Sequence, residues 1–261
     1  MKKPRIKTME ALSAAIGVSR PTLSKFFQDP DSVRDSTRRR IRDGLASVEY
    51  VPNFFATKMN RKETRLIGVI VPHLKDLFFS SLIERIETTA TEAGYGTIIQ
   101  NSHGSPEHEA RAATTLMSMS VDGIIIAPIG RNSRRDHIAR MVEQLPTVFV
   151  DSHFPGEFQS VDFVGTDNQQ SMSLIVDYLA RSGDAPVLLG MPPLNSNSEE
   201  REAAYRTRME ALGRRPETVP YLDAPVSWEF EKFAYDLMNM HFSRGAYTSG
   251  TLLCANDRLA I

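Results

Sequence analysis

The sequence predicts an α/β protein with an N-terminal helix-turn-helix head and a two-lobed body built on parallel sheets. Three observations support this class. The first 65 residues contain three short apolar patterns of helical period, and they are basic, with 15 Lys and Arg against 7 Asp and Glu. Continuous apolar runs then alternate with helical stretches along the rest of the chain. The net charge of −1 therefore hides a basic head on an acidic body.

The composition excludes several other classes of protein. The 261 residues are 41% hydrophobic and 24% charged, which is typical of globular domains. No apolar run approaches the roughly 18 residues of a membrane span. The basic N-terminus is not followed by the apolar stretch of a secretory signal, so we expect a cytoplasmic protein. The single cysteine, Cys254, excludes an intramolecular disulfide and is expected to be buried and inert.

The first fifty residues carry the pattern of a helix-turn-helix. Thr8 is expected to cap a helix that Gly17 ends, and Ser19 to cap a second helix only two residues later. Such a second helix fits the major groove of DNA with its first residues nearest the bases. The residues expected to contact DNA are Arg20, Pro21, Thr22, Ser24 and Lys25. A plain helical hairpin is the alternative interpretation.

These side chains differ in what they can recognise. Arg20 or Lys25 can bond guanine, and Ser24 can pair with several bases or with phosphate. Pro21 offers only apolar contact, for example to a thymine methyl group. A third helix is expected from Asp35 to Val48. Its arginines are expected to combine phosphate contacts with ordinary solvated charge; they are Arg38, Arg39, Arg40 and Arg42.

After Arg65 the pattern predicts alternating strands and helices. Strands are expected at 66–71, 97–100, 123–127, 147–150 and 161–165, with helices near 78–93, 107–119 and 134–144. After a helix at 169–181, a second set has strands at 187–190, 219–222 and 252–255, with helices near 199–212 and 230–242. This alternation predicts two parallel sheets with right-handed crossovers.

The carboxyl ends of the expected strands carry the candidate ligand site, because ligands of open α/β sheets bind there. These ends hold residues 76–79, 128–129, 151–152, 196–201 and 256–257. Aromatic faces beside a carboxylate, an arginine and an asparagine suit a sugar, whose C–H face covers a ring and whose hydroxyls bond polar groups. Each residue also has a structural interpretation: Phe78 or Phe79 as core, Arg201 as surface charge, Trp228 as packing between lobes and Asp257 as a helix cap.

Two segments resemble a known family. Met9–Lys25 resembles the helix-turn-helix of the lactose-repressor (LacI/GalR) family, and Tyr50–Ala56 resembles the hinge signature of that family. The resemblance continues through the chain. It implies a body like the periplasmic sugar-binding proteins, a homodimer on double-stranded operator DNA, repression, and control by a small-molecule effector. In the family the hinge orders on DNA and inserts apolar side chains into the minor groove, which places further DNA contacts at Asn53, Ala56 and Met59.

The resemblance also places effector contacts. They fall on Phe78, Phe79, Asp151, Arg201, Trp228, Asn256 and Asp257. Arg201 matches the first residue of an R-x-x-G-aromatic motif, in which Ala204 here replaces the glycine. We expect a sugar as the effector, although a purine or an anionic sugar would use several of the same residues.

These observations divide the chain into four parts: a DNA-binding domain at 1–50, a hinge at 51–64, an effector-binding first lobe at 65–166 and a second lobe at 167–261. Family members run beyond Ile261, so the second lobe is expected to be incomplete. The sequence contains no phosphate-binding loop, no metal-ligand spacing and no nucleophile elbow, so we expect no catalytic residue, no cofactor and no metal. The alternatives to a regulator are a sugar-binding protein without DNA function and an inactive, shortened regulator.

Overall fold

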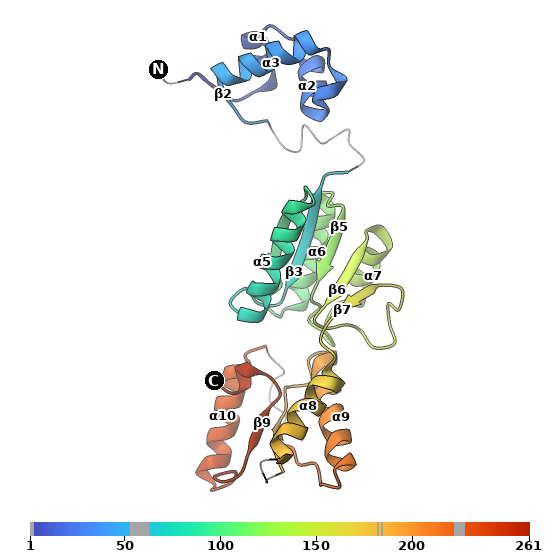
Figure 1. The fold of residues 1–261 in the computed structure, drawn as a ribbon, viewed down its shortest axis with the longest axis vertical. Helices are drawn as coiled ribbons and strands as arrows, with labels where there is room; N and C mark the ends of the chain where they lie inside the picture. Colours follow the sequence, from blue (N-terminus) through green and yellow to red (C-terminus); the bar gives the residue numbers. More distant parts are fainter. Residues whose placement is uncertain (1–2, 53–62, 182, 184, 222–227) are drawn as a thin grey trace. The chain divides into compact units, whose positions relative to one another are not determined.

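The protein is described by a computed structural model that covers residues 3–52, 63–181, 183, 185–221 and 228–261. The chain forms two compact units, Met1–Thr64 and Arg65–Ile261, which we call the head and the body (Figure 1). Among the described residues, no helix has the length and apolar character that crossing a membrane requires.

The head consists of three helices around a small core. They are α1 (Met9–Ile16), α2 (Arg20–Gln28) and α3 (Asp35–Ser47), with a 3-10 turn, η1 (Pro30–Ser32), between the last two. The Thr8 hydroxyl accepts a hydrogen bond from the Ala11 N–H at 3.1 Å, and Gly17 ends α1 with a φ of 69°. Leu12, Leu23 and Ile41, one from each helix, are fully buried. The three expected helices are therefore present.

Two details of the head differ from expectation. The Ser19 hydroxyl does not cap the backbone of α2; it bonds the Thr22 hydroxyl at 2.8 Å. The third helix ends at Ser47, one residue before the expected Val48, because Val48 is extended with a φ of −127°. The chain then forms β2 (Glu49–Tyr50), which pairs in parallel with β1 (Arg5–Ile6). Strands of two residues carry no periodic signal, so this pair was not anticipated.

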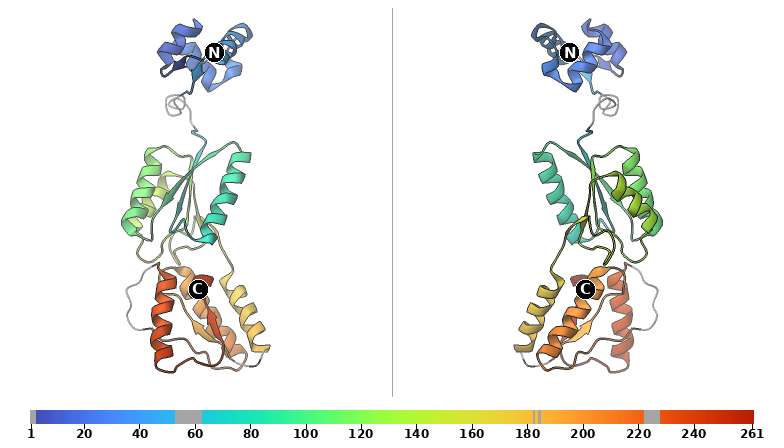
Figure 2. Two further views of the ribbon diagram at one scale, coloured as in Figure 1. Left: turned by 90° about the vertical axis from the view of Figure 1, so that its left-hand side faces the viewer. Right: turned by 90° about the vertical axis from the view of Figure 1, so that its right-hand side faces the viewer.

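The first lobe of the body contains a parallel five-stranded sheet in the order β4-β3-β5-β6-β7. Its strands are β3 (Leu66–Val71), β4 (Gly96–Asn101), β5 (Gly123–Ile126), β6 (Thr147–Val150) and β7 (Asp162–Val164). The crossover helices are α5 (Leu77–Glu92), α6 (Pro106–Ser118) and α7 (Arg135–Gln144). Figure 2 shows α5 on one face of the sheet and α6 with α7 on the other.

Alternating residues of the central strands face the two helical layers. Val69 and Val71 of β3 belong to the same buried cluster as Phe79 of α5. Ile70 of β3 and Ile124 of β5 instead belong to the cluster beneath α6 and α7. Because both faces are covered, the strands read as unbroken apolar runs in the sequence.

The second lobe is built on a smaller parallel sheet. It pairs β8 (Val187–Leu189) with β9 (Leu252–Cys254), and its helices are α8 (Asn168–Arg181), α9 (Ser196–Ala211) and α10 (Phe230–Ser243). A last 3-10 turn, η2, spans Asp257–Leu259.

The strand expected at 219–222 is not formed in its described part. The chain here pairs with β8 only through a single parallel bridge between Thr218 and Leu188. Next to this bridge, the Val219 N–H donates to the Leu188 carbonyl. Pro220 follows and has no N–H to donate, so regular pairing stops there. Leu222 lies outside the described residues.

Candidate functional site: a basic recognition helix and a ligand pocket

The exposed side of α2 carries the predicted DNA contacts. Arg20, Pro21 and Lys25 are exposed, and Thr22 and Ser24 are half-buried. Neither the Arg20 guanidinium nor the Lys25 ammonium forms a hydrogen bond or ion pair with another described residue of the head. The opposite side of α2 buries Leu23 and Phe26 in the core. The helix therefore presents to solvent basic groups that no described residue engages, while its apolar side anchors it.

The arginines of α3 have unequal roles. The Arg40 Nε donates to the Ile16 carbonyl at 3.1 Å, which satisfies the C-terminal end of α1. Arg38 forms ion pairs with Asp31 and Asp35. These two side chains therefore hold the head together. Arg39 and Arg42, which are exposed, remain available for phosphate contacts.

The predicted hinge contacts cannot be placed in the same way. Asn53, Ala56 and Met59 lie outside the described residues.

The body contains a pocket of about 250 Å³ that is lined from both lobes. All seven predicted effector contacts line it: Phe78, Phe79, Asp151, Arg201, Trp228, Asn256 and Asp257. Seven further residues complete the wall: Asp76, Thr166, Met191, Asn195, Asn197, Phe230 and Arg258. The tertiary structure thus brings together residues from 76 to 258 in the sequence at the carboxyl ends of five strands.

Asp151 is the most unusual side chain of the pocket. It follows β6 with a φ of 64°, a left-handed conformation that aspartate tolerates better than most residues. Its carboxylate accepts a hydrogen bond from the Asn197 amide at 3.1 Å. Burial raises the pKa of Asp151 to about 6, against the opposing effects of Arg201 and Asn197. A carboxyl group with this pKa can accept or donate a hydrogen bond to a ligand hydroxyl near neutral pH.

Arg201 is held in place by two bonds. Its Nε donates to the Asn168 side-chain carbonyl at 2.8 Å, and its Nη1 donates to the Ala255 backbone carbonyl at 2.8 Å. Burial lowers the pKa of Arg201, although neighbouring carboxylates, with Asp151 first, act in the opposite direction. No described residue accepts a hydrogen bond from Nη2. That nitrogen is therefore the part of the guanidinium available to a ligand.

Four aromatic rings supply the apolar surface, from Phe78, Phe79, Trp228 and Phe230. Phe79 is 2% exposed and belongs to the core, whereas Phe78 is 50% exposed. The rings of Phe78 and Phe79 meet edge to face at 5.1 Å. Trp228 is 7% exposed and lies 5.6 Å from the Phe230 ring. The structural interpretation of Phe79 and Trp228 is therefore supported by their burial, and their role as effector contacts stays a prediction that their place in the pocket lining allows.

The two residues after Ala255, which follows β9, are Asn256 and Asp257, and the cap that was expected at Asp257 is formed by Asn256. Asn256, and not Asp257, caps the next turn, because its side-chain carbonyl accepts from the Leu259 N–H at 3.0 Å. The Asn256 amide nitrogen lies 3.1 Å from the Met191 sulfur. The Asp257 carboxylate accepts a hydrogen bond only from the neighbouring Arg258 N–H among the described residues. One Asp257 oxygen is thus left for a ligand.

Sequence reasoning missed the lining residues that sit beside predicted ones. Asn197 lies within the expected range 196–201, although it was not singled out as a contact. Arg258 follows Asp257, and Asn195 directly precedes α9, which also carries Arg201. Their position after strands was the signal that could have identified them. Asp76 lies within the expected range 76–79; it caps α5 by accepting from the Phe78 N–H at 2.9 Å, and it also lines the pocket.

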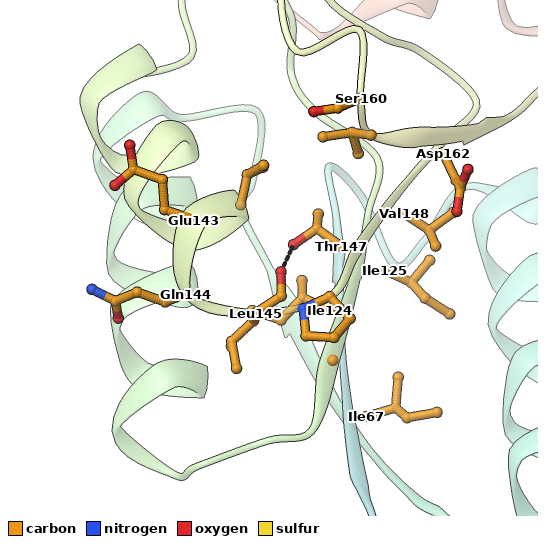
Figure 3. Close-up of a pocket in the computed structure, with 14 residues that line it drawn as sticks. Ile67, Ile124, Ile125, Glu143, Gln144, Leu145, Thr147, Val148, Ser160 and Asp162 are labelled. Carbon is orange, nitrogen blue, oxygen red and sulfur yellow. Dashed lines mark hydrogen bonds between the residues drawn. The ribbon is translucent and has the colours of Figure 1, made fainter.

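A larger hollow of about 640 Å³ lies at the opposite, amino ends of the first-lobe strands. Figure 3 shows aliphatic side chains of Ile67, Ile125 and Val148 along the sheet. The carboxylates of Glu143 and Asp162 lie on opposite sides of this view and do not converge. The hydrogen bond drawn there joins the Thr147 hydroxyl to the Leu145 carbonyl at 3.0 Å. The smaller pocket, with its converging polar groups, is therefore the candidate site.

The comparison with known proteins agrees with this geometry. A family model described as periplasmic binding proteins and sugar binding domain of LacI family matches residues 64–261. The chain belongs to the LacI family. Its curated relatives include the HTH-type transcriptional regulator PtxS of Pseudomonas aeruginosa. PtxS is 30% identical over 212 residues, which cover 80% of this chain and 60% of PtxS. The HTH-type transcriptional repressor CytR of Escherichia coli is 30% identical over 184 residues, which cover 70% of this chain and 52% of CytR.

A solved structure of the LacI family shares the fold. The Lac repressor dimer bound to operator and the anti-inducer ONPF matches with a TM-score of 0.78 and 21% identity, over 99% of this chain and 76% of that one. The predicted α/β fold class, with a helical head and parallel sheets in the body, is confirmed. The chain spans about 60% of the length of the first curated relatives it matches. These relatives are transcriptional regulators and not enzymes, as expected for this chain.

Proposed function

We propose that this protein is a sequence-specific transcription regulator, acting as a repressor, whose affinity for operator DNA is controlled by a sugar bound in the body. It acts in the cytoplasm as a homodimer on a near-palindromic site. The observation that carries the proposal is the presence, in one chain, of an exposed helix whose Arg20 and Lys25 no described residue engages, and of a pocket lined by rings and hydroxyl-bonding groups.

The head supports the DNA-binding part of the proposal. Arg20 and Lys25 lie on the exposed side of α2, near its first turns, where recognition helices contact bases. Arg39 and Arg42 are exposed on α3 and can neutralise phosphates. Release of counterions by these groups makes DNA affinity fall steeply with salt.

The pocket supports a small neutral effector. Its volume of about 250 Å³ is below the roughly 300–1,000 Å³ typical of drug-sized ligands, which favours a monosaccharide over a nucleotide. The lining includes three carboxylates, from Asp76, Asp151 and Asp257, and two guanidinium groups, from Arg201 and Arg258. Because carboxylates exceed cations, a neutral polyhydroxyl compound suits the pocket better than an anion.

The function is tested by selecting binding sites from a random pool of double-stranded DNA with the purified protein. We expect enrichment of a near-palindromic sequence whose retention falls as salt rises. Monosaccharides are then screened by the emission of Trp228, the only tryptophan, and positive sugars are added to the DNA-binding assay. Failure to enrich any site, with or without sugars, contradicts the DNA-binding part. Sugar binding without DNA selection would indicate a sugar-binding protein instead.

A further inference from the structure

The two lobes of the body also meet outside the ligand pocket. The loop of residues 128–133 follows β5 of the first lobe and contacts the segment 194–199 that begins α9 of the second lobe. The Arg131 N–H donates to the Leu194 carbonyl at 2.7 Å. The Arg131 guanidinium forms an ion pair with Glu199, in which Nε lies 2.9 Å from the carboxylate. None of these three residues lines the pocket.

Gly130 is the point of closest approach. Its φ is 99°, and a Cβ atom added there would lie 2.2 Å from the Leu194 carbonyl oxygen and 2.7 Å from the Asn195 Cα. Both obstacles are backbone atoms, which cannot rotate away as a flexible side chain can. The two lobes can therefore pack as they do in this structure only with glycine at position 130.

The loop is held rigidly by the first lobe. Glu109 of α6 is 1% exposed, and its carboxylate accepts from the Ile129 N–H at 2.8 Å. The Arg135 guanidinium donates to the Gly130 carbonyl at 3.0 Å, and the Ser152 hydroxyl donates to the Pro128 carbonyl at 2.7 Å. Burial raises the pKa of Glu109, so this carboxyl group is costly to keep inside the fold. The loop is thus held by groups of the first lobe alone as well as by its contact with the second lobe.

The segment on the other side of the contact carries pocket residues. Asn195 caps α9, and both Asn195 and Asn197 line the pocket. Arg201 lies further along the same helix. His153, which follows β6, adds a hydrogen bond from its N–H to the Ser196 hydroxyl at 3.2 Å. A shift of this contact would therefore move the α9 side of the pocket.

We propose that residues 128–133, which we call the closure seat, set the closed arrangement of the two lobes and so tune effector affinity without touching the effector. Gly130 and Arg131 are positioning residues. Gly130 permits the backbone approach, and Arg131 fastens α9 through Leu194 and Glu199. The effect on the effector rests on the proposed function, whereas the lobe contact can be tested without any ligand.

Trp228 provides a ligand-free readout of this contact. It belongs to the second lobe, yet it packs against Gly104 of the first lobe so closely that an added Cβ there would lie 2.4 Å from its Cδ1. The Trp228 ring also lies 6.0 Å from the ring of His73, again in the first lobe. Separation of the lobes would expose the indole to water and to a soluble quencher.

The experiment compares acrylamide quenching of Trp228 in full-length wild-type protein, Gly130→Ala and the matched control Gly156→Ala. Gly156 also has a positive φ, of 79°, but an added Cβ would meet nothing within 4 Å. We expect a several-fold rise in the quenching constant and a red-shifted emission for Gly130→Ala, with little change for the control. Circular dichroism establishes that each variant is folded.

Two milder variants keep the test decisive if Gly130→Ala fails to fold. Arg131→Ala and Glu199→Gln remove the ion pair and leave the backbone unchanged, and each should raise the quenching constant by a smaller factor. Wild-type quenching in all folded variants overturns the proposal. For a monosaccharide found in the Trp228 screen, affinity should fall by about 5- to 150-fold in Gly130→Ala, the usual range of coupling between two states. If no sugar binds the wild type while quenching still responds, the proposed function fails and the closure seat stands.

Discussion

The Arg258 Nη1 in the second lobe lies 3.3 Å from the Asp76 Oδ2 in the first lobe, although the two residues are 182 positions apart. Both side chains are largely shielded, at 16% and 12% exposure. Arg258 is oriented by Glu231 and by the Phe230 ring, which its guanidinium carbon covers at 4.8 Å. The pair therefore bridges the lobes on the wall of the pocket.

Asp76→Asn should weaken this bridge without removing the helix cap. The asparagine carbonyl oxygen can still accept from the Phe78 N–H, but its amide nitrogen then replaces the Oδ2 that accepts from Arg258. Both the ionic attraction and that hydrogen bond are therefore lost, while the cap is kept. We expect the free energy of unfolding to fall by about 1–2 kcal/mol, between the values for exposed and buried pairs. Asp76→Ala should lose about 1 kcal/mol more, because the cap is also removed. Urea denaturation measures both, and an unchanged Asp76→Asn would show that the bridge contributes nothing to stability.

Asp151→Asn should stabilise the body above pH 6 and impair the effector response. The pKa of Asp151 is raised from 3.8 to about 6, so the fold favours the protonated form. The resulting cost is absent below pH 3.8, grows as the pH rises to about 6 and is then constant. The shift corresponds to about 3 kcal/mol, and the pKa of about 6 already includes the opposing effect of Arg201.

Thermal melts from pH 4 to pH 8 check the Asp151→Asn prediction. The variant should have the higher melting temperature at pH 8 and approach the wild type at pH 4. Asparagine tolerates the left-handed φ of position 151, so backbone strain does not confuse the comparison. A gap between variant and wild type that widens on acidification would contradict the assigned cause.

Lys25→Ala should weaken binding to the selected operator by roughly 1–3 kcal/mol. The ammonium group is exposed on α2 and is not engaged by another described residue, so its loss should leave the fold of the head unchanged. Lys75→Ala is the matched control, because it removes one exposed lysine from the body. Gel-shift titrations at fixed salt measure both. If Lys25→Ala and Lys75→Ala bind the operator with the same affinity, Lys25 does not take part in DNA recognition.

Arg201→Ala should abolish the effector response and leave operator binding in place. The substitution also deprives the Ala255 carbonyl of its donor, so a loss of about 1–3 kcal/mol in the stability of the body is expected. Arg206→Ala controls for charge on the same helix, since Arg206 pairs with Glu202 at the exposed surface. Operator binding is measured with and without the sugar identified in the screen. If Arg201→Ala loses operator binding while the control Arg206→Ala keeps it, Arg201 has a role in folding and not in the effector response.

Much of the fold could be predicted because its signals are local. The apolar runs gave rise to the expected strands, and capping residues such as Thr8 and Gly17 lie at the ends of α1 as expected. The candidate site could also be predicted, because the carboxyl ends of parallel strands converge wherever such a sheet forms. The strand pair β1–β2 could not be predicted, because strands of two residues are too short to show an apolar period. The strand expected after Thr218 is only a single bridge in the described residues, and periodicity does not tell where pairing stops.

The sequence by itself determined the class of the fold, the placement of basic groups on α2 and the family to which the chain belongs. Tertiary structure decided which polar groups are already engaged. It joined Arg40 to α1, assigned the cap to Asn256 and brought Gly130 against Leu194. These contacts connect segments of different elements. Their geometry follows from the packing of whole lobes, which no local pattern of residues specifies.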